Sequence, residues 1–382
     1  MYETLKDFLT DDFWIMPATP KYIDKGVPYI TSKNIKNGKI DYNNINYISK
    51  EDYENISKNR PIKVNDILIS MIGTIGETAV VTKADGDFYG QNMFLVRLND
   101  KKINQRFFLN YFKSSFVKNQ LFNKQNKSTQ SYLKANHIED LKVPVISIEE
   151  QIKIADKLDK IQMMIDEKKE QISLLNQLIK SQFVEMFGDI ESNSNNYKIV
   201  ELSEISDYWN GLTYKPSNIV DKDGTIVLRS SNIQESKIDY KDIVRIDCNI
   251  GEKKFVNEND ILMCSRNGSS RLVGKVALIP RTDEKMSFGA FMMIIRSKYY
   301  PYLFTYFQTN AFRKQISTGA TTTINQITTN MMNKVKLPLP SEQDIEKFNI
   351  LLKQIDKQKF EFEKSLKKLE ELQASLMQEY FG

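Results

Sequence analysis

The chain has very few of the residues that most catalytic and metal sites need. Its 382 residues include one histidine, His137, and two cysteines, Cys248 and Cys264. The cysteines lack CxxC spacing, so neither a disulfide framework nor a structural zinc site is expected. Motifs for nucleotide cradles, serine hydrolases and zinc proteases are also missing. We therefore expect no catalysis by this chain alone, no metal and no cofactor, and we interpret His137 as an ordinary surface or boundary residue.

Long apolar runs and a strong charge of one sign are missing too. Runs such as "FMMII" at 291–295 are far shorter than the roughly 18 residues that a membrane span needs. The acidic start, "MYETLKDFLTDD", does not have the pattern of a signal peptide, so a cytoplasmic location is expected. The 54 basic and 49 acidic residues leave a net charge of +5, which permits a nucleic-acid partner without requiring one.

What the chain does contain is a tandem duplication. The segment "NIKNGKIDY" at 34–42 recurs as "NIQESKIDY" at 232–240. The match continues through "NDILIS" and "NDILMC", through "YGQNMFLVR" and "FGAFMMIIR", and to "SQFVEMFG" and "SLMQEYFG", although the second copy lacks the Gln-Asn of "YGQN". The offset stays between 194 and 199 residues, so the repeating unit is about half the chain and the protein is not a solenoid.

Each copy has a mixed first part and a helical second part. Short runs of β-branched residues bounded by Gly, Asn and Asp predict strands. Residues 104–122 have apolar residues at helical spacing and are expected to form a helix. The sequences "KVPVIS" and "KLPLPS" then close the two mixed parts with proline.

A long helix follows each mixed part. Residues 149–187 contain no proline or glycine, would span roughly 58 Å as a helix, and have a narrow apolar stripe near a 3.5-residue period. That stripe is typical of a coiled coil, and it recurs in the second copy. The alternative is two separate amphipathic helices, each packed on its own domain. We predict an α+β fold, with two pseudo-twofold-related α/β recognition domains separated by a pair of long antiparallel coiled-coil helices. The expected segments are 1–146 (domain 1), 147–190 (central helix), 191–340 (domain 2) and 341–382 (C-terminal helix).

Polar loops occupy matching places in the two copies and differ between them, whereas the flanking strands agree. Asn, Gln, Ser, Thr, Arg and Lys are the residues that hydrogen-bond to base edges and phosphates, although such residues are also common in ordinary turns. The differing "KNG" and "QES" within the opening repeat are interpreted as the place where the two copies begin to read different DNA. The candidate DNA-binding residues are Lys33, Asn34, Lys36, Lys127, Ser128, Thr129, Gln130, Tyr132, Arg229, Asn232, Ser265, Arg266, Asn267, Ser269, Arg271, Thr321, Thr322 and Asn325.

Taken in order, these segments resemble one family over essentially the whole chain: the specificity (S) subunits of type I restriction–modification enzymes. The resemblance rests on "GVPYITSKNI", "NDILIS", "KSTQSYL", "LKVPVISIEEQIKIADKLDKI" and "LLNQLIKSQFVEMFGD". It implies that each recognition domain reads one half of a bipartite, asymmetric site on double-stranded DNA, and that the helix pair sets the gap. It also implies two adenine-methyltransferase (M) subunits as partners, motor and nuclease (R) subunits in the full complex, and no cofactor of the chain's own.

Two other functions remain open from the residues alone. One is a coiled-coil scaffold with two protein-binding modules, although the arginine-containing loops favour DNA because protein hot spots depend more on exposed Trp and Tyr. The other is the specificity subunit of a system that only methylates. The sequence does not give the bases recognised, because readout depends on loop conformation and DNA shape.

Overall fold

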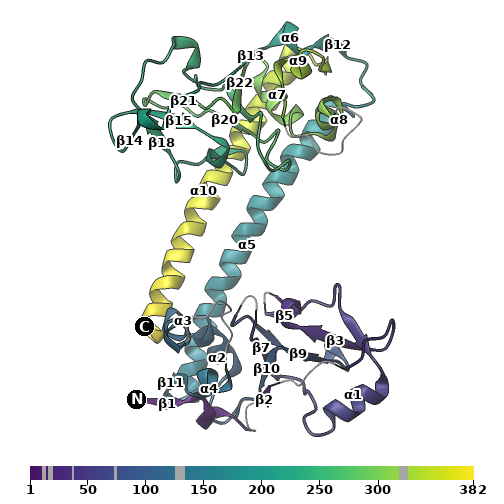
Figure 1. The fold of residues 1–382 in the computed structure, drawn as a ribbon, viewed down its shortest axis with the longest axis vertical. Coiled ribbons are helices and arrows are strands. Elements are labelled where there is room, and N and C mark those ends of the chain that lie inside the picture. Colours follow the sequence, from purple (N-terminus) through teal and green to yellow (C-terminus); the bar gives the residue numbers. More distant parts are fainter. Residues whose placement is uncertain (11–13, 16–19, 37, 73–74, 125–133, 318–325) are drawn as a thin grey trace. The chain divides into compact units, whose positions relative to one another are not determined.

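The structure is a computed structural model, and it describes residues 1–10, 14–15, 20–36, 38–72, 75–124, 134–317 and 326–382. Contacts divide the chain into two compact units. Unit 1 comprises Met1–Lys169 together with Lys364–Gly382, and unit 2 comprises Glu170–Glu363. Both chain ends therefore belong to unit 1 (Figure 1). The division differs from the four segments expected from the sequence, because each long helix is shared between the units.

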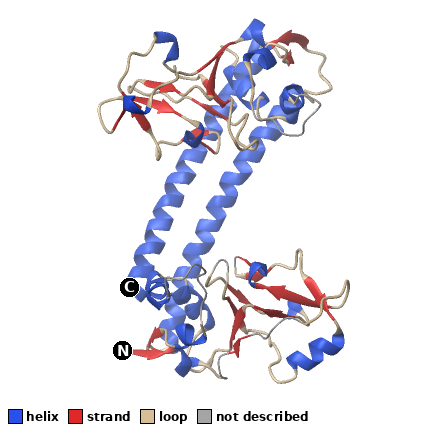
Figure 2. Cartoon of the chain, viewed as in Figure 1, coloured by secondary structure: helices blue, strands red, loops and turns tan. Residues whose placement is uncertain are grey.

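Unit 1 contains two small sheets and a group of helices (Figure 2). The first sheet is antiparallel, with the order β2 (Trp14–Ile15), β10 (Met93–Val96), β7 (Ile67–Ser70) and β8 (Thr78–Val80). The second has the order β6 (Asn46–Ile48), β3 (Val27–Thr31) and β9 (Tyr89–Gln91), with β3 and β9 parallel. Two short pairs complete the strands: β4 (Ile35–Lys36) with β5 (Lys39–Ile40), and β1 (Tyr2–Thr4) with β11 (Lys142–Pro144). The short helices are α1 (Lys50–Ser57), α2 (Gln105–Phe112), α3 (Ser115–Lys124) and α4 (Ala135–Glu139).

Unit 2 repeats this plan. Its antiparallel sheet has the order β13 (Asp207–Asn210), β22 (Met292–Arg296), β19 (Ile261–Cys264) and β20 (Val276–Leu278). Its mixed sheet has the order β14 (Ile219–Val220), β18 (Val244–Ile246), β15 (Thr225–Leu228) and β21 (Met286–Phe288), with β15 and β21 parallel. The short pairs are β16 (Ile233–Gln234) with β17 (Lys237–Ile238), and β12 (Lys198–Glu201) with β23 (Lys336–Leu339). The short helices are α6 (Leu202–Ile205), α7 (Tyr300–Tyr306), α8 (Asn310–Ile316) and α9 (Thr329–Met332).

The single helix expected over 104–122 is in fact two helices, α2 and α3. Ser114 lies between them and is buried. Its backbone N–H donates to Tyr111 O at 2.9 Å, and its Oγ accepts from Val117 N at 3.3 Å. Serine side chains compete in this way for backbone groups and favour a helix start over a helix interior. The apolar spacing continues through the break, so periodicity alone did not reveal it.

The repeated "NDIL" segment is buried on both faces, which explains its apolar run. In β7, Ile67 and Ile69 pack in the core shared with the helices, whereas Leu68 packs in the core between the sheets. In β19, Ile261 and Leu262 divide in the same way. Each unit therefore has two hydrophobic cores, separated by its antiparallel sheet.

The Asn-Asp that precedes each of these strands forms a turn with a buried ion pair. Asn65 and Asn259 have φ of 74° and 67°, in the left-handed region that asparagine tolerates better than most residues. The following aspartates are buried. Asp66 accepts from Arg97 Nε and Nη2 at 2.7 and 2.8 Å, and Asp260 accepts from Arg296 Nε and Nη2 at 2.7 Å each. The matching geometry indicates one framework used twice.

Two helices of 40 residues each, α5 (Ile148–Phe187) and α10 (Glu342–Phe381), begin in one unit and end in the other. The aromatic end of each is buried in the unit it enters. In unit 1 the Phe381 ring lies 5.4 Å from Phe107, and in unit 2 the Phe187 ring lies 5.1 Å from Tyr302. The last turns of both helices are thus parts of hydrophobic cores.

Inside unit 1 the two helices run in opposite directions. Lys157, Gln162 and Lys169 of α5 contact Tyr380, Gln373 and Glu370 of α10 in that order, at 3.2, 2.9 and 3.3 Å. In unit 2, Lys359 of α10 donates to Asn176 of α5 at 2.6 Å. Among the described residues, no helix has both the length and the apolar composition required to cross a membrane.

Candidate nucleic-acid interface

The asparagine shared by the two opening repeats is a structural residue in both units. Asn34 is 6% exposed and Asn232 is fully buried. The Oδ1 atom of Asn34 accepts from Thr31 N at 2.9 Å, and its Nδ2 donates to Asp41 O at 2.9 Å. Asn232 holds its own turn in the same way, accepting from Arg229 N and donating to Asp239 O. We therefore correct the sequence-based assignment and remove both asparagines from the candidate DNA contacts, because their polar atoms are used by the fold.

The basic side chains around these turns differ in whether they are paired with a carboxylate. Lys36 Nζ lies 2.6 Å from Asp41 Oδ2, and hydrogen bonding to Lys36 holds the pKa of the Asp41 carboxyl below its usual value. Arg229 Nη2 lies 2.9 Å from Asp242 Oδ2. Lys33 is exposed, and within the described part of the chain it makes no hydrogen bond or ion pair. Of these three cations, Lys33 is thus the best placed to meet a phosphate.

In unit 2 the structure brings two of the predicted loops together. Asn267 Nδ2 donates to Ser230 Oγ at 3.0 Å, and Asn267 Oδ1 accepts from Ser269 N at 2.9 Å. The loop at 229–232 and the loop at 265–271 therefore form one surface. Ser265 itself is buried, and its backbone N–H donates to Phe291 O at 2.9 Å. It shapes the loop and is also removed from the candidate contacts, whereas Ser269 and Arg271 are exposed.

Arg266 lies at the centre of this surface, against an aromatic ring. Its guanidinium carbon is 5.3 Å from the ring centroid of Phe291, a side chain that is 59% exposed. In the described part of the chain, this guanidinium makes no hydrogen bond or ion pair. An isolated β-bridge also joins Arg266 to Gln326, the first described residue after the loop at 318–325. A cation that is free among the described residues is thus held on an exposed ring, beside the bridge to Gln326.

Unit 1 places different side chains at the matching positions. Ser32 Oγ donates to Asn92 O, and Met71 N donates to Asn92 O at 3.1 Å, just as Ser265 N donates to Phe291 O. Asn92 is exposed with φ of 61°, and Ile72 is 48% exposed. The repeat matches Asn92 with Phe291 and Ile72 with Arg266. The two sites share one backbone hydrogen bond, but they differ in their side chains, in the left-handed φ of Asn92 and in the second bond, from Arg266 N to Phe291 O.

Eight predicted contacts lie outside the described residues, so the structure does not locate them. These are Lys127, Ser128, Thr129, Gln130 and Tyr132 in the first copy, and Thr321, Thr322 and Asn325 in the second.

The "QES" turn of unit 2 has one side chain engaged within its own unit, whereas Gln234 and Glu235 are exposed, so its reading of DNA stays a prediction. Ser236 Oγ donates to Gln308 Oε1 at 3.1 Å. The neighbouring Lys237 Nζ lies 2.7 Å from Glu363 Oε1 on α10. Ser236 and Lys237 thus link the β16–β17 pair to the segment between α7 and α8 and to α10.

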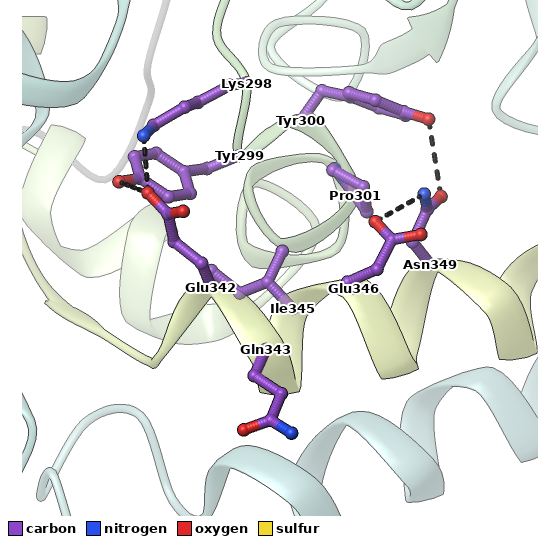
Figure 3. A pocket seen from close by; sticks show the side chains of 9 residues that line it. All are labelled: Lys298, Tyr299, Tyr300, Pro301, Glu342, Gln343, Ile345, Glu346 and Asn349. Carbon is purple, nitrogen blue, oxygen red and sulfur yellow. Dashed lines mark hydrogen bonds and ion pairs between the residues drawn. The ribbon is translucent and has the colours of Figure 1, made fainter.

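A cavity of about 420 Å³ lies where α7 meets the start of α10 (Figure 3). Its polar side chains are engaged with one another, except that of Gln343, which makes no hydrogen bond among the described residues. Glu342 is bound by Lys298 and by the Tyr299 hydroxyl, and hydrogen bonding to Lys298 lowers the pKa of the Glu342 carboxyl. Asn349 accepts from the Tyr300 hydroxyl at 3.3 Å and donates to Glu346 at 3.2 Å. Two carboxylates and internally paired donors make this a poor site for phosphate.

The described residues hold no group of three or more His, Cys, Asp or Glu side chains arranged to bind a metal ion. His137 is half-buried on α4, and its Nδ1 accepts from Lys134 N at 3.4 Å. Cys264 is buried in the core between the sheets of unit 2, and burial raises the pKa of its thiol, which disfavours the reactive thiolate. These residues serve the fold.

Comparison with protein families decides which protein family the chain represents. The family model described as "Type I restriction modification DNA specificity domain" matches twice, over residues 16–177 and 194–374. The chain belongs to this family. The resemblance drawn from the sequence is therefore confirmed, as is the expectation of a non-catalytic DNA-recognition subunit.

Similar proteins agree with this placement. The putative type I restriction enzyme MjaX specificity subunit of Methanocaldococcus jannaschii is 26% identical over 90% of this chain and 85% of its own length. Among solved structures, a chain from work on complex assembly and conformational transition of the type I R-M system has a TM-score of 0.57, with 16% identity, over 100% of this chain and 97% of its own. The S subunit from M. genitalium also has a TM-score of 0.57, with 14% identity, over 100% and 96%. These structures share the fold of the specificity subunit.

Sequence reasoning missed Phe291 and its counterpart Asn92. Both lie just before a buried strand, inside segments that the repeat marked as framework. The available signal was the loss of the Gln-Asn of "YGQN" in the second copy. A single exposed apolar side chain is ordinary on a protein surface. An exposed phenylalanine that lies against an arginine of a neighbouring loop forms a cluster, and such a cluster indicates an interaction site.

Proposed function

We propose that each unit of this specificity subunit reads one half of a bipartite, asymmetric site on double-stranded DNA. Residues 1–146 and 191–340 would be the two target recognition domains. The observation that carries the proposal is the joined loop surface of unit 2, where Arg266 keeps a free guanidinium beside Asn267 and Ser230. Arginine and amide groups are the side chains that read base edges in the major groove.

Different side chains at matching positions of the repeat support the reading of two different half-sites. These positions, which share one backbone hydrogen bond, carry Ile72 and Asn92 in unit 1 but Arg266 and Phe291 in unit 2. A protein that needed two identical sites would have no reason to change these positions. We keep Lys33, Lys36, Arg229, Asn267, Ser269 and Arg271, together with the eight residues outside the described part of the chain, as proposed DNA contacts.

We further propose that α5 and α10 form an antiparallel coiled coil that sets the gap between the half-sites. In this proposal the pair also docks two adenine-methyltransferase subunits, and motor and nuclease subunits join the full complex. The net charge of +5 is small for a protein that would hold DNA alone, since each neutralised phosphate requires a cation. The partners would supply much of the phosphate contact and this chain the base contacts.

The decisive experiment maps methylated adenines in DNA from cells that express the chain together with its methyltransferase partner. A bipartite motif that disappears when the chain is deleted supports the proposal. Unchanged methylation after the deletion would sink it. A restriction assay on unmodified phage DNA in the same cells separates a complete restriction system from one that only methylates.

A binding measurement tests the division of labour between subunits. We expect the purified chain to bind DNA weakly and with a strong dependence on salt, and the chain with its methyltransferase to bind the motif tightly. Equal motif-specific affinity without the partner would contradict this part of the proposal.

A further inference from the structure

We propose that Arg266, held against the ring of Phe291, reads a guanine in the half-site of unit 2. The inference rests on the proposed function and adds the base, the reading group and the residue that positions it. It concerns two side chains that meet across a loop and a strand end, Arg266 after β19 and Phe291 before β22.

Phe291 has a backbone that is held in place and a ring that is exposed. Its carbonyl accepts two backbone hydrogen bonds, from Ser265 N at 2.9 Å and from Arg266 N at 3.1 Å. These bonds tie the arginine's own backbone to the phenylalanine. The next residue, Met292, is buried at the start of β22, so the segment cannot shift without disturbing the core. The ring nevertheless stays 59% exposed, so it is not part of the hydrophobic core.

Among the described residues, Arg266 and Arg271 of this loop both have guanidinium groups without a hydrogen bond or ion pair, and of these two only Arg266 is held against a ring. Arg229 pairs with Asp242 at 2.9 Å, and Arg313 of α8 donates to Val273 O at 3.0 Å. Arg266 contacts the face of Phe291 at 5.3 Å and has no carboxylate or carbonyl partner among the described residues. A guanidinium stacked on a ring loses less conformational freedom when it binds, because its plane is already fixed.

Guanine is the base that suits this group. Its O6 and N7 atoms are two acceptors side by side in the major groove, and a guanidinium bonds to both at once. Asn267 is next to Arg266 in the chain, and its amide bonds to Ser230 and Ser269, so the loop that carries the arginine is held in place. A lone phosphate contact would need neither the ring nor the fixed neighbour.

Unit 1 provides a comparison inside the same molecule. Ile72 and Asn92 occupy the places of Arg266 and Phe291 in the repeat, and Asn92 O accepts from Met71 N as Phe291 O accepts from Ser265 N. An exposed asparagine is suited to adenine, and an exposed isoleucine to the methyl group of thymine. The matching position of the other half-site should therefore show no preference for guanine.

The test uses the full chain with its methyltransferase and measures adenine methylation on duplexes that carry each single base change in the motif. For Arg266→Ala we expect discrimination at one guanine, in one half-site, to fall by about 10- to 100-fold. Discrimination in the other half should not change. Arg281→Ala is the matched control, because Arg281 is exposed and unpaired within the described residues but lies away from these loops. It should lower binding uniformly, if at all, and leave every base preference in place.

Phe291 is tested as a positioning residue. Phe291→Ala should reduce discrimination at the same guanine by about 3- to 10-fold, and Phe291→Tyr should restore it, since both rings present a face to a guanidinium. A merely structural role would lower methylation of all sequences together. Asn92→Ala should change preference only in the half-site of unit 1.

The outcomes separate the two proposals. If the wild-type chain directs no bipartite methylation, the proposed function fails and the inference fails with it. If the motif is bipartite but Arg266→Ala keeps its guanine preference, or weakens all sequences equally as a phosphate contact would, the inference alone is overturned. Loss confined to one guanine, with rescue by Phe291→Tyr, supports it.

Discussion

The side-chain amide of Asn267 donates a hydrogen bond to the hydroxyl of Ser230 at 3.0 Å, across 37 residues of sequence. This bond makes one surface of two loops that belong to different sheets of unit 2. Ser230 has its counterpart in Ser32 of unit 1, whose hydroxyl donates instead to the backbone of Asn92. A serine of the first turn thus bonds to the second loop in unit 2, but to the residue before β10 in unit 1.

Ser230→Ala should weaken recognition of one half-site without unfolding the protein. The lost bond is partly exposed, so we expect a stability loss of no more than about 1 kcal/mol and a reduction in motif affinity of about 3- to 10-fold. Fluorescence anisotropy with motif duplexes and urea unfolding measure the two effects. Ser231→Ala, which changes an exposed neighbour whose hydroxyl makes no bond among the described residues, is the control and should change neither. Equal effects from the two variants would refute the positioning role.

Asp260→Asn should destabilise unit 2 strongly. Its buried carboxylate accepts from two nitrogens of Arg296 and from Asn257 N at 2.7 Å, and an amide cannot accept on both sides. Because Arg296 remains partly exposed to solvent, we expect a loss of about 2–3 kcal/mol in urea unfolding, at the low end for a broken buried pair.

Asp66→Asn should lower the free energy of unfolding of unit 1 by a similar amount, because Asp66 and Arg97 form the corresponding ion pair there. Glu284→Gln breaks the more exposed pair with Arg245 and should cost under about 0.5 kcal/mol. A large effect of Glu284→Gln together with a small effect of Asp260→Asn would contradict the ranking by burial.

Phe381→Ala should destabilise unit 1 although Phe381 is the penultimate residue. The ring is 2% exposed and packs against Phe107 and Tyr111, with centroids 5.4 and 5.8 Å away. Removing it leaves a cavity in the core, for which a loss of about 3 kcal/mol is expected. Phe360→Ala on the same helix removes a ring that is 61% exposed and should cost under about 0.5 kcal/mol in the isolated chain. Hydrogen exchange should show the loss of protection in unit 1.

Lys359→Met should stabilise the protein at neutral pH by about 1 kcal/mol. Lys359 is 7% exposed, and burial lowers the pKa of its ammonium group. Its partner Asn176 is exposed and can return to water, so the variant leaves no buried polar atom behind.

The pH dependence of this gain follows from the sign of the shift. A lowered folded-state pKa means that burying the charged lysine costs stability at neutral pH, where the lysine is protonated in the unfolded chain. The cost disappears as pH rises above the unfolded value near 10.5. The advantage of Lys359→Met in urea unfolding should therefore shrink as the pH rises toward about 10.5. An advantage that grew with pH would contradict the buried-charge explanation.

Inserting four residues into both α5 and α10 should lengthen the gap between the proposed half-sites. Four helical residues add about 6 Å, which corresponds to one or two base pairs at about 3.4 Å each. Methylation mapping of the variant measures the new gap. An insertion in α5 alone would shear the antiparallel contacts, such as Gln162 with Gln373, and should abolish methylation. A fixed gap with both half-sites still read would rule out the helices as a spacer.

The sequence predicted the segments that occur twice and the helices that have a regular apolar spacing. "NDIL" is recognisable twice because a strand buried on both sides must stay apolar, and the long helices are recognisable because an apolar seam continues without a breaker. It could not separate Asn34 and Asn232 from true contacts, because a buried asparagine that holds a turn and an exposed one that reads a base look alike as letters. Nor could it pair Arg266 with Phe291, which lie 25 residues apart and meet only through the sheet.

The burial of Phe381 in unit 1 has a consequence for the order of synthesis. Unit 2 is one continuous segment, Glu170–Glu363, and all of it emerges from the ribosome before the last turns of α10. Unit 1 is begun first, yet its core lacks a ring until Phe381 has been translated. We expect the nascent amino-terminal half to stay partly folded and open to chaperones until Phe381 packs against Phe107 and Tyr111. A truncation that removes Phe381 would thus damage the part of the protein that was made earlier.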